Sequence, residues 1–232
     1  MTTKQKRRIL NVDIKVDTPT EEIGHIKCER LLGVCIQDDL KWSNYILHDE
    51  KSLIKQLSTR LQALRMISSA GSFKIRLMVA NGIFCSKLIF QICLWGGTEE
   101  YLLNALQVVQ NKAARFVTRR DRYTSVQDLI RQCGWISVKQ LVFYHSVILI
   151  YKIIQNKHPK YMYSKLATQF PYNTRLAQTD SVRMGPNFQS KKSFMNRATI
   201  SYNYLPKELR AVSKIETFKI KVKQWVKENI EF

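Results

Sequence analysis

The sequence lacks any apolar run long enough to cross a membrane as a helix. Its longest apolar stretches are Ile83–Trp95 and Leu141–Ile154, and polar residues interrupt each of them. Both are shorter than the roughly 20 residues that a membrane-spanning helix needs. The basic residues near Met1 are followed by no apolar core, so we expect no signal peptide. These absences predict buried helices in a protein that has no membrane partner.

The sequence also lacks the usual residue patterns of metal and nucleophile chemistry. His25-x-x-Cys28 has half of a zinc-site spacing, but no C-x-x-C or H-x-x-x-H partner accompanies it. Cys133 and His145 are residue types of a nucleophile pair, yet nothing in the sequence places them together. No glycine motif that cradles phosphate is present. The cysteines are odd in number, 5, and lie in apolar contexts, which predicts reduced thiols inside a cell.

Acidic residues are scarce relative to basic ones: 18 Asp and Glu stand against 38 Lys and Arg, a net charge of +20. The charges balance within residues 1–40, so the whole excess lies beyond them. A folded body with charge of one sign repels itself, and the usual compensation is a polyanion. Because 45% of the 232 residues are hydrophobic, the chain can bury a core, as one large domain or two small ones. The composition therefore predicts a globular protein that binds nucleic acid.

The spacing of apolar residues predicts a short β-rich start followed by helices. It predicts strands at Ile9–Val16 and Ile23–Cys28, and a third, buried strand at Leu31–Ile36 around Gly33. After the third strand, steps of three and four residues predict helices over about 45–68, 73–94, 99–118 and 137–155, and a final helix to about 229. Capping-box patterns at Ser125, Ser137 and Ser213 mark predicted helix starts. Residues 167–204 lack such periodicity, which predicts a long basic loop with short strands.

Four sequence elements occur in an order that points to one family. They are Arg30–Trp42; Leu106–Arg115; Tyr151-Lys-Ile ahead of His158-Pro-Lys-Tyr161; and Tyr202-Asn-Tyr-Leu-Pro206 ahead of Phe218-Lys219. In this order, over nearly the whole chain, they resemble the reverse transcriptases of LINE-type (non-LTR) retrotransposons. Two positions depart from the family pattern, since Leu31 stands in place of an aromatic residue and Tyr202 in place of Trp.

The resemblance implies that the chain is the C-terminal part of such a polymerase: the primer grip, the thumb and the region that follows. The family's catalytic F/Y-x-D-D lies N-terminal to the primer grip and is absent from this sequence. Asp38-Asp39 imitates it, because two-metal phosphoryl transfer needs neighbouring carboxylates. It follows the hairpin, however, and we interpret it as an acidic turn. We therefore expect no catalytic residue, metal ligand or cofactor in this chain alone, whereas the complete enzyme is expected to use Mg²⁺.

The resemblance also implies the domains and the partners. Residues 1–42 correspond to the end of the palm with a primer-grip-like hairpin, 43–122 to a thumb-like helical bundle, and 123–232 to a helical region with the basic loop 167–204. The fold class that follows is mainly α, with a small N-terminal antiparallel β element. The expected partners are RNA and DNA, as a template–primer duplex, and the missing N-terminal fingers and palm of the same polyprotein. We expect the protein to be intracellular and nuclear.

The candidate nucleic-acid-binding residues are of two kinds. Leu32 and Gly33 belong to the hairpin, and the resemblance places them near the primer terminus. The others are cations on predicted helices and in the predicted loop, which suit a phosphate backbone: Lys41, Lys51, Lys55, Arg60, Lys112, Arg115, Arg119, Arg120, Arg122, Lys191 and Lys192.

We expect Lys51, Lys55 and Arg60 to lie away from the apolar stripe of the first helix. Each cation also suits a solvated helix face, so two other hypotheses stay open. One is an independent, non-catalytic nucleic-acid-binding protein derived from such an element. The other is a helical scaffold for protein interactions.

Overall fold

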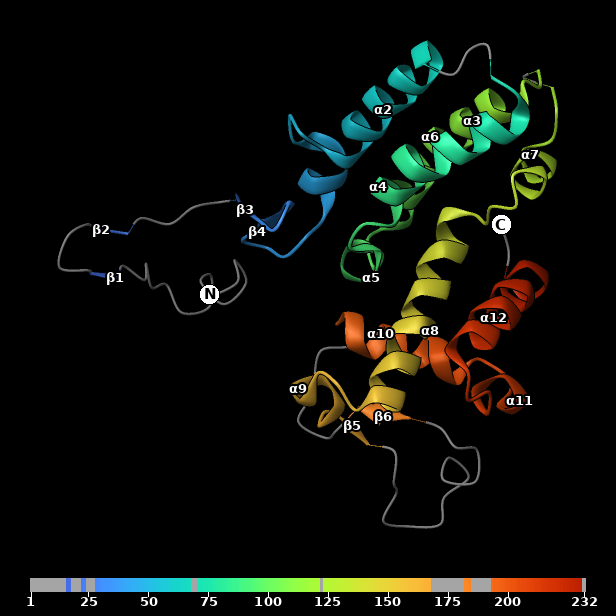
Figure 1. Ribbon diagram of the computed structural model, residues 1–232. Coiled ribbons are helices and arrows are strands. Elements are labelled where there is room, and N and C mark those ends of the chain that lie inside the picture. Colours follow the sequence, from blue (N-terminus) through green and yellow to red (C-terminus); the bar gives the residue numbers. More distant parts are fainter. Residues whose placement is uncertain are drawn as a thin grey trace.

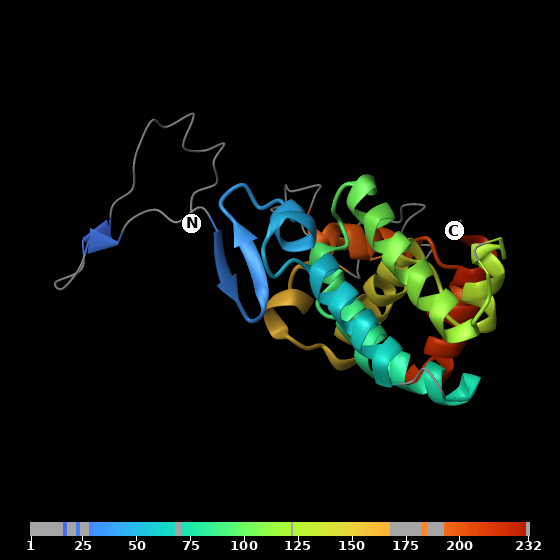
Figure 2. The same ribbon diagram turned by 90° about the horizontal axis from the view of Figure 1, so that it is seen from above.

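The computed structural model describes residues 16–17, 22–23, 28–67, 71–121, 123–167, 182–184 and 193–230. The fold is mainly helical, with a small antiparallel sheet near the N-terminus, as predicted. Figures 1 and 2 show the β3–β4 hairpin at one side of the helical body and the C-terminus toward the other. The strands within these ranges form antiparallel pairs: β1 (Val16–Asp17) with β2 (Glu22–Ile23), β3 (Cys28–Leu31) with β4 (Val34–Gln37), and β5 (Leu166–Ala167) with β6 (Arg183–Met184).

The hairpin of β3 and β4 has the two-residue turn Leu32-Gly33. Both turn residues have positive φ, 49° and 82°, which is the combination that suits the twist of a two-residue hairpin. The prediction of one buried strand over Leu31–Ile36 is therefore wrong, because the chain reverses in the middle of that range. Leu31 and Leu32 are 60% and 80% exposed. Apolar residues at an exposed hairpin tip gave the pattern of a buried strand.

A disulfide joins Cys28 of β3 to Cys35 of β4, with 6.3 Å between their Cα atoms. Cys35 pairs with Arg30, and Cys28 pairs with Gln37, so the alternation of side chains places both cysteines on one face. The prediction that all the thiols are reduced is wrong for this pair, because it did not foresee the turn that brings them onto facing strands. Of the two predicted strands before Cys28, the residues that the structure describes form the short pair β1–β2.

The predicted helix over 45–68 divides in two. η1 (Asn44–His48) is a π-helical turn, and α2 (Leu53–Ile67) begins after a short break. The carboxylate of Asp49 accepts the Lys51 backbone N–H at 3.1 Å, a local bond that competes with continuation of the helix. Beyond the break, the buried stripe of α2 follows the predicted spacing, with Leu53, Leu57, Leu61 and Leu64 in the core.

The predicted helix over 73–94 is continuous to Ile89 and then breaks. It consists of α3 (Phe73–Ala80), the π-helical segment η2 (Asn81–Cys85) and α4 (Ser86–Ile89). Phe90 leaves the helix with φ −59° and ψ 122°, and Gln91 has φ 55°. A single turn, α5 (Ile92–Trp95), follows. The chain therefore changes direction at Phe90-Gln91.

Three helices lie where their caps and stripes predicted them. They are α6 (Glu100–Thr118), α7 (Val126–Gln132) and α8 (Val138–Asn156). Ser137 caps α8 with the predicted capping box, whereas Ser125 precedes α7 without a side-chain hydrogen bond. The first core includes α2, α6, α7 and the start of α8, so it extends past the expected boundary at residue 122.

The second core is built on α8, which is apolar nearly all round and contributes to both cores. Figure 1 shows α10 (Phe194–Asn203) and α12 (Ile215–Asn229) beside α8, with α9 (Lys160–Tyr163) and α11 (Lys207–Arg210) near the same end of the molecule. No helix within the described ranges is both long enough and apolar enough to cross a membrane.

The predicted loop over 167–204 is wrong in its last part, because α10 begins at Phe194. Met195, Ala198 and Tyr202 form the buried face of α10 at helical steps. The helix escaped prediction because polar residues lie between these positions and one of the three is only a small Ala. The part of the loop between residues 168 and 192 lies outside the described residues, apart from 182–184. α12 also begins slightly later than expected, after Lys214 rather than Ser213.

Candidate nucleic-acid interface

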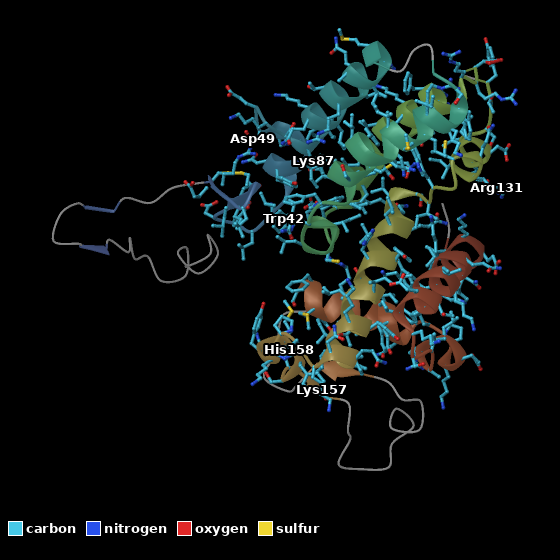
Figure 3. All side chains as sticks on the ribbon, in the orientation of Figure 1. Trp42, Asp49, Lys87, Arg131, Lys157 and His158 are labelled. Atoms are coloured by element: carbon cyan, nitrogen blue, oxygen red, sulfur yellow. A yellow bond between two sulfur atoms is a disulfide. The ribbon has the colours of Figure 1, made fainter. Side chains whose placement is uncertain are left out.

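A surface hollow of ≈ 340 Å³ lies where the hairpin meets the helical bundle. It is lined by Gly33 of the hairpin, Arg60 of α2, and Ser86, Lys87 and Phe90 at the end of α4. Figure 3 shows Lys87 on the side of the bundle toward the hairpin, with Trp42 and Asp49 in the same region. Three segments that are remote in sequence therefore bring two cations and one aromatic ring into one site.

Backbone contacts fix Phe90 at the edge of this hollow. Its carbonyl accepts the indole N–H of Trp95 at 2.8 Å, and its own N–H donates to the carbonyl of Lys87 at 3.3 Å. Because Trp95 is fully buried, the turn is fastened to the first core. Phe90 is 38% exposed as a residue, and Lys87 Nζ lies over one face of its ring, 5.0 Å from the centroid. The ring is thus a positioned, accessible aromatic surface beside a cation.

Gly33 brings the hairpin against the Phe90 ring. A Cβ added to Gly33 would lie 3.7 Å from a carbon of that ring, at ordinary contact distance. Side-chain atoms beyond such a Cβ would compete for the space of the hollow. With φ 82°, the position also has a conformation that glycine adopts most readily. Gly33, a predicted site residue, therefore lies where the turn of the hairpin closely approaches an aromatic side chain.

The hollow has a positive electrostatic environment. Burial, followed by the charges of Arg60 and Arg30, lowers the pKa of the Lys87 ammonium from its ordinary value. Arg30 is paired, since its Nη2 lies 2.6 Å from Asp49 Oδ2. Across the described ranges, by contrast, no carboxylate forms an ion pair with Arg60 or Lys87. An anion bound in the hollow would offset the repulsion between these cations.

Three predicted cations lie at this end of the bundle, namely Lys41, Lys51 and Lys55, and all three are exposed. Lys41 Nζ is 3.9 Å from Asp39 Oδ2, so its charge is partly balanced. Lys55 belongs to the first turn of α2 and lies away from its apolar stripe, as predicted, whereas Lys51 lies in the turn just before α2.

Arg60 does not lie away from that stripe, so this prediction is wrong. It is half-buried, and its Nη1 donates to the carbonyl of Ile83 at 2.7 Å. The physical reason is helical spacing: Arg60 is three residues after Leu57 and four before Leu64, which places it on the flank of the buried face. Its guanidinium therefore ties α2 to η2 while it lines the hollow.

A second group of predicted cations gathers at the C-terminal end of α6. Lys112, Arg119 and Arg120 are exposed, and Arg115 is half-buried. Arg76 of α3 also reaches this end, where its Nε donates to the Val117 carbonyl at 2.9 Å. Positive charge at a helix C-terminus is favourable in itself, so this group also has a structural explanation.

The two groups lie at opposite ends of the bundle. α3, which contacts the end of α6 through Arg76, follows the C-terminal end of α2, whereas Lys51 and Lys55 lie at the start of α2 and Arg60 of the hollow lies at its middle. Figure 3 agrees, because Arg131 of α7 lies far from Lys87. With 15 residues, α2 is about 22 Å long. A duplex that contacts both groups must therefore run along α2.

Three predicted residues, Arg122, Lys191 and Lys192, lie outside the described residues. The structure also places two residues in the site that the sequence did not predict, namely Lys87 and Phe90. Lys87 interrupts an apolar run and was interpreted as an interruption in a buried helix. No signal in the sequence marks the helix break at Phe90-Gln91 that shapes this site.

The local structure of Asp38-Asp39 agrees with the interpretation of this pair as an acidic turn. Both residues lie in a turn, and Asp39 Oδ1 accepts the Lys41 backbone N–H at 3.0 Å. Within the ranges that the structure describes, no three His, Cys, Asp or Glu side chains gather as a metal site. Burial raises the pKa of Cys85 to about 12 and that of Cys133 to about 11, so both thiols are protonated at neutral pH.

Comparison with known proteins gives no assignment: no protein-family model matches the chain, and no match was found among curated proteins or solved structures.

Proposed function

We propose that this chain is the C-terminal, non-catalytic part of the RNA-directed DNA polymerase of a LINE-type retrotransposon, and that it holds a template–primer duplex. The observation that carries the proposal is the gathering of Arg60, Lys87 and Phe90 against the turn of the Leu32-Gly33 hairpin. Two further facts support it: the four family-like elements in order and the net charge of +20. In this proposal the hairpin corresponds to the primer grip, and α2 to α6 correspond to the thumb.

The proposed mechanism is electrostatic. Lys51, Lys55 and Lys87 lie on or beside rigid helices at one end of the bundle, where they contact successive phosphates and release the counterions condensed on the duplex. Phosphate contacts position a protein on a duplex without reading its sequence. The chain therefore binds RNA–DNA duplexes without sequence preference, and the Mg²⁺-dependent chemistry belongs to the fingers and palm of the complete polyprotein. The proposed place of action is the nucleus.

The exposed leucines of the hairpin region fit the same proposal. Leu31 and Leu32 at the hairpin tip are 60% and 80% exposed, and Leu40 beyond the end of β4 is 57% exposed. Exposed apolar side chains favour contact with another protein surface. In the proposal this surface is the missing palm. A helical interaction scaffold, the competing hypothesis, would use the same leucines but has no need of unpaired cations beside them.

Equilibrium binding of the purified chain to a fluorescent RNA–DNA duplex tests the proposal. We expect similar affinities for duplexes of unrelated sequence and a linear fall of log affinity with log salt. Unmeasurable binding at low salt, or binding with no salt dependence, would refute duplex holding and favour the scaffold.

A further inference from the structure

We infer that the hollow between the hairpin and α4 binds one unpaired nucleotide, with its base against the Phe90 ring and its phosphate beside Lys87 and Arg60. This inference rests on the proposed function and makes it more specific, because it assigns a strand end or an extrahelical base, rather than a paired segment, to one site. The contacts, the size and the charge of the hollow each support it.

The size of the hollow suits a single nucleotide. Its volume of ≈ 340 Å³ is at the small end of the roughly 300–1,000 Å³ that small-molecule sites occupy. One base with its phosphate is a ligand of that class, whereas a base pair embedded in a duplex is larger and cannot leave its neighbours. The nucleotide that enters must therefore be unpaired.

The aromatic ring that lines the hollow is that of Phe90, which is exposed and held in place by its backbone. The hydrogen bond from the indole of Trp95 fixes the backbone of Phe90 at the point where α4 ends, and the residue remains 38% exposed. Base–aromatic stacking tolerates every base, because each base has a π-face. A stacking site of this kind gains nothing from a base that is already stacked inside a duplex.

The charged component suits a phosphate. Arg60 and Lys87 both line the hollow, and Lys87 Nζ lies over one face of the Phe90 ring, 5.0 Å from its centroid, so the proposed base takes the face of the ring that the ammonium does not cover. The two cations repel each other and, in the described part of the chain, have no carboxylate partner. Ser86 adds a hydroxyl, although that hydroxyl already donates to the carbonyl of Gly82.

Gly33 keeps the space open. Because its Cβ position is 3.7 Å from the ring, a longer side chain would lie against Phe90 in place of a base. Asn is a suitable probe, since it tolerates positive φ better than most residues. Gly33→Asn should thus fill the hollow at modest cost to the hairpin.

The test compares two RNA–DNA duplexes that differ by one unpaired terminal 2-aminopurine nucleotide, using the full chain. We expect the overhang to raise affinity about 10-fold, within the range that stacking of one base supplies. We also expect the 2-aminopurine fluorescence to fall on binding, because stacking quenches it. Phe90→Leu and Gly33→Asn should remove the preference, while Phe90→Trp should keep it.

Tyr204→Leu is the matched control, since Tyr204 is an aromatic residue of the second core region with 63% exposure; it should keep the preference. Circular dichroism establishes that each variant is folded. Equal wild-type affinity for the blunt duplex and the overhang, or a preference that survives Phe90→Leu, would overturn the inference while salt-dependent duplex binding persists. Failure to bind either duplex would overturn the inference and the proposed function together.

Discussion

Arg76 and Val117 connect the beginning of α3 to the end of α6, because the Arg76 Nε donates to the Val117 carbonyl at 2.9 Å. Arg76 is 5% exposed, and its Nη1 also donates to the carbonyl of Gly71. The guanidinium thus satisfies carbonyls at a helix end and in the preceding turn, where backbone groups otherwise lack partners. This buried cation belongs to the structure of the bundle rather than to its nucleic-acid surface.

Arg76→Met should therefore destabilise the fold. It removes charge-assisted bonds to two carbonyls, each worth roughly 1.5–3 kcal/mol, while methionine recovers part of the packing. We expect the free energy of unfolding to fall by about 2–3 kcal/mol in urea titrations. Arg120→Met, at an exposed position near the same helix end, should change it by less than about 0.5 kcal/mol. Equal losses for both variants would contradict the structural role of Arg76.

Gly97→Ala should loosen the contact between the two cores. Arg197 of α10 donates to the Cys93 carbonyl of α5 at 2.6 Å, and a Cβ on Gly97 would lie 1.6 Å from its Nη1. The guanidinium must move and lose that bond, so we expect a loss of about 1–3 kcal/mol by thermal or urea unfolding. Gly82→Ala is the control, because nothing lies within 4 Å of its Cβ position, and it should be neutral or stabilising by about 0.5–1 kcal/mol.

The chain alone should not polymerise DNA. Asp38 and Asp39 lie in a turn, and Asp39 is engaged with the backbone N–H of Lys41, so the pair lacks the arrangement that holds two metal ions. Primer extension on an oligonucleotide-primed RNA template with Mg²⁺ or Mn²⁺ should show no incorporation. Incorporation that disappears in Asp38→Ala and Asp39→Ala would overturn this assignment.

The apolar pattern predicted some helices of the structure well and failed at the turn of the β3–β4 hairpin. α6 follows a strong apolar stripe and α8 is apolar nearly all round, and Ser137 with Gln140 forms the capping box that the sequence predicted. The apolar pattern alone missed the turn at Leu32-Gly33, because these residues have the apolar character of a strand although their positive φ values make them a turn. The hairpin was expected only from the family resemblance. Turn conformation depends on φ and ψ, which hydropathy does not encode.

The candidate site was predictable in part. Charge pattern identified the exposed Lys55, since cations opposite an apolar stripe face solvent, and the exposed Lys51 in the turn before α2. It did not identify Lys87 or Phe90, because their exposure results from the helix break at Gln91 and from the approach of Gly33, 57 residues before Phe90 in the chain. Tertiary approach of this kind leaves no local signal.

Duplex binding should weaken at high pH through Lys87. Burial and the neighbouring guanidiniums lower its pKa in the free protein, and a phosphate beside it favours the charged form and raises the pKa again. Binding therefore takes up a proton once the pH exceeds the lowered pKa, and affinity falls as the pH rises toward the ordinary lysine value. A DNA duplex titrated between about pH 7 and pH 10 should show this loss.

Lys87→Arg keeps the charge through that range and should flatten the pH profile. Lys55→Arg, at an exposed position, should leave the profile as it is in the wild type. A Lys87→Arg profile that coincides with the wild-type curve would show that Lys87 does not contact the bound phosphates.

The most direct test of the account compares the salt dependence of duplex binding between two triple variants that lose the same charge. Lys51, Lys55 and Lys87 are changed to Gln in one, and Lys214, Lys221 and Lys227, around and along α12, in the other. On a B-form duplex the first variant should reduce the slope of log affinity against log salt by roughly 2–3 units, about 0.9 for each lost phosphate contact, while the second leaves it nearly unchanged. Equal slopes for the two folded variants would contradict a nucleic-acid interface at the hairpin end of the bundle.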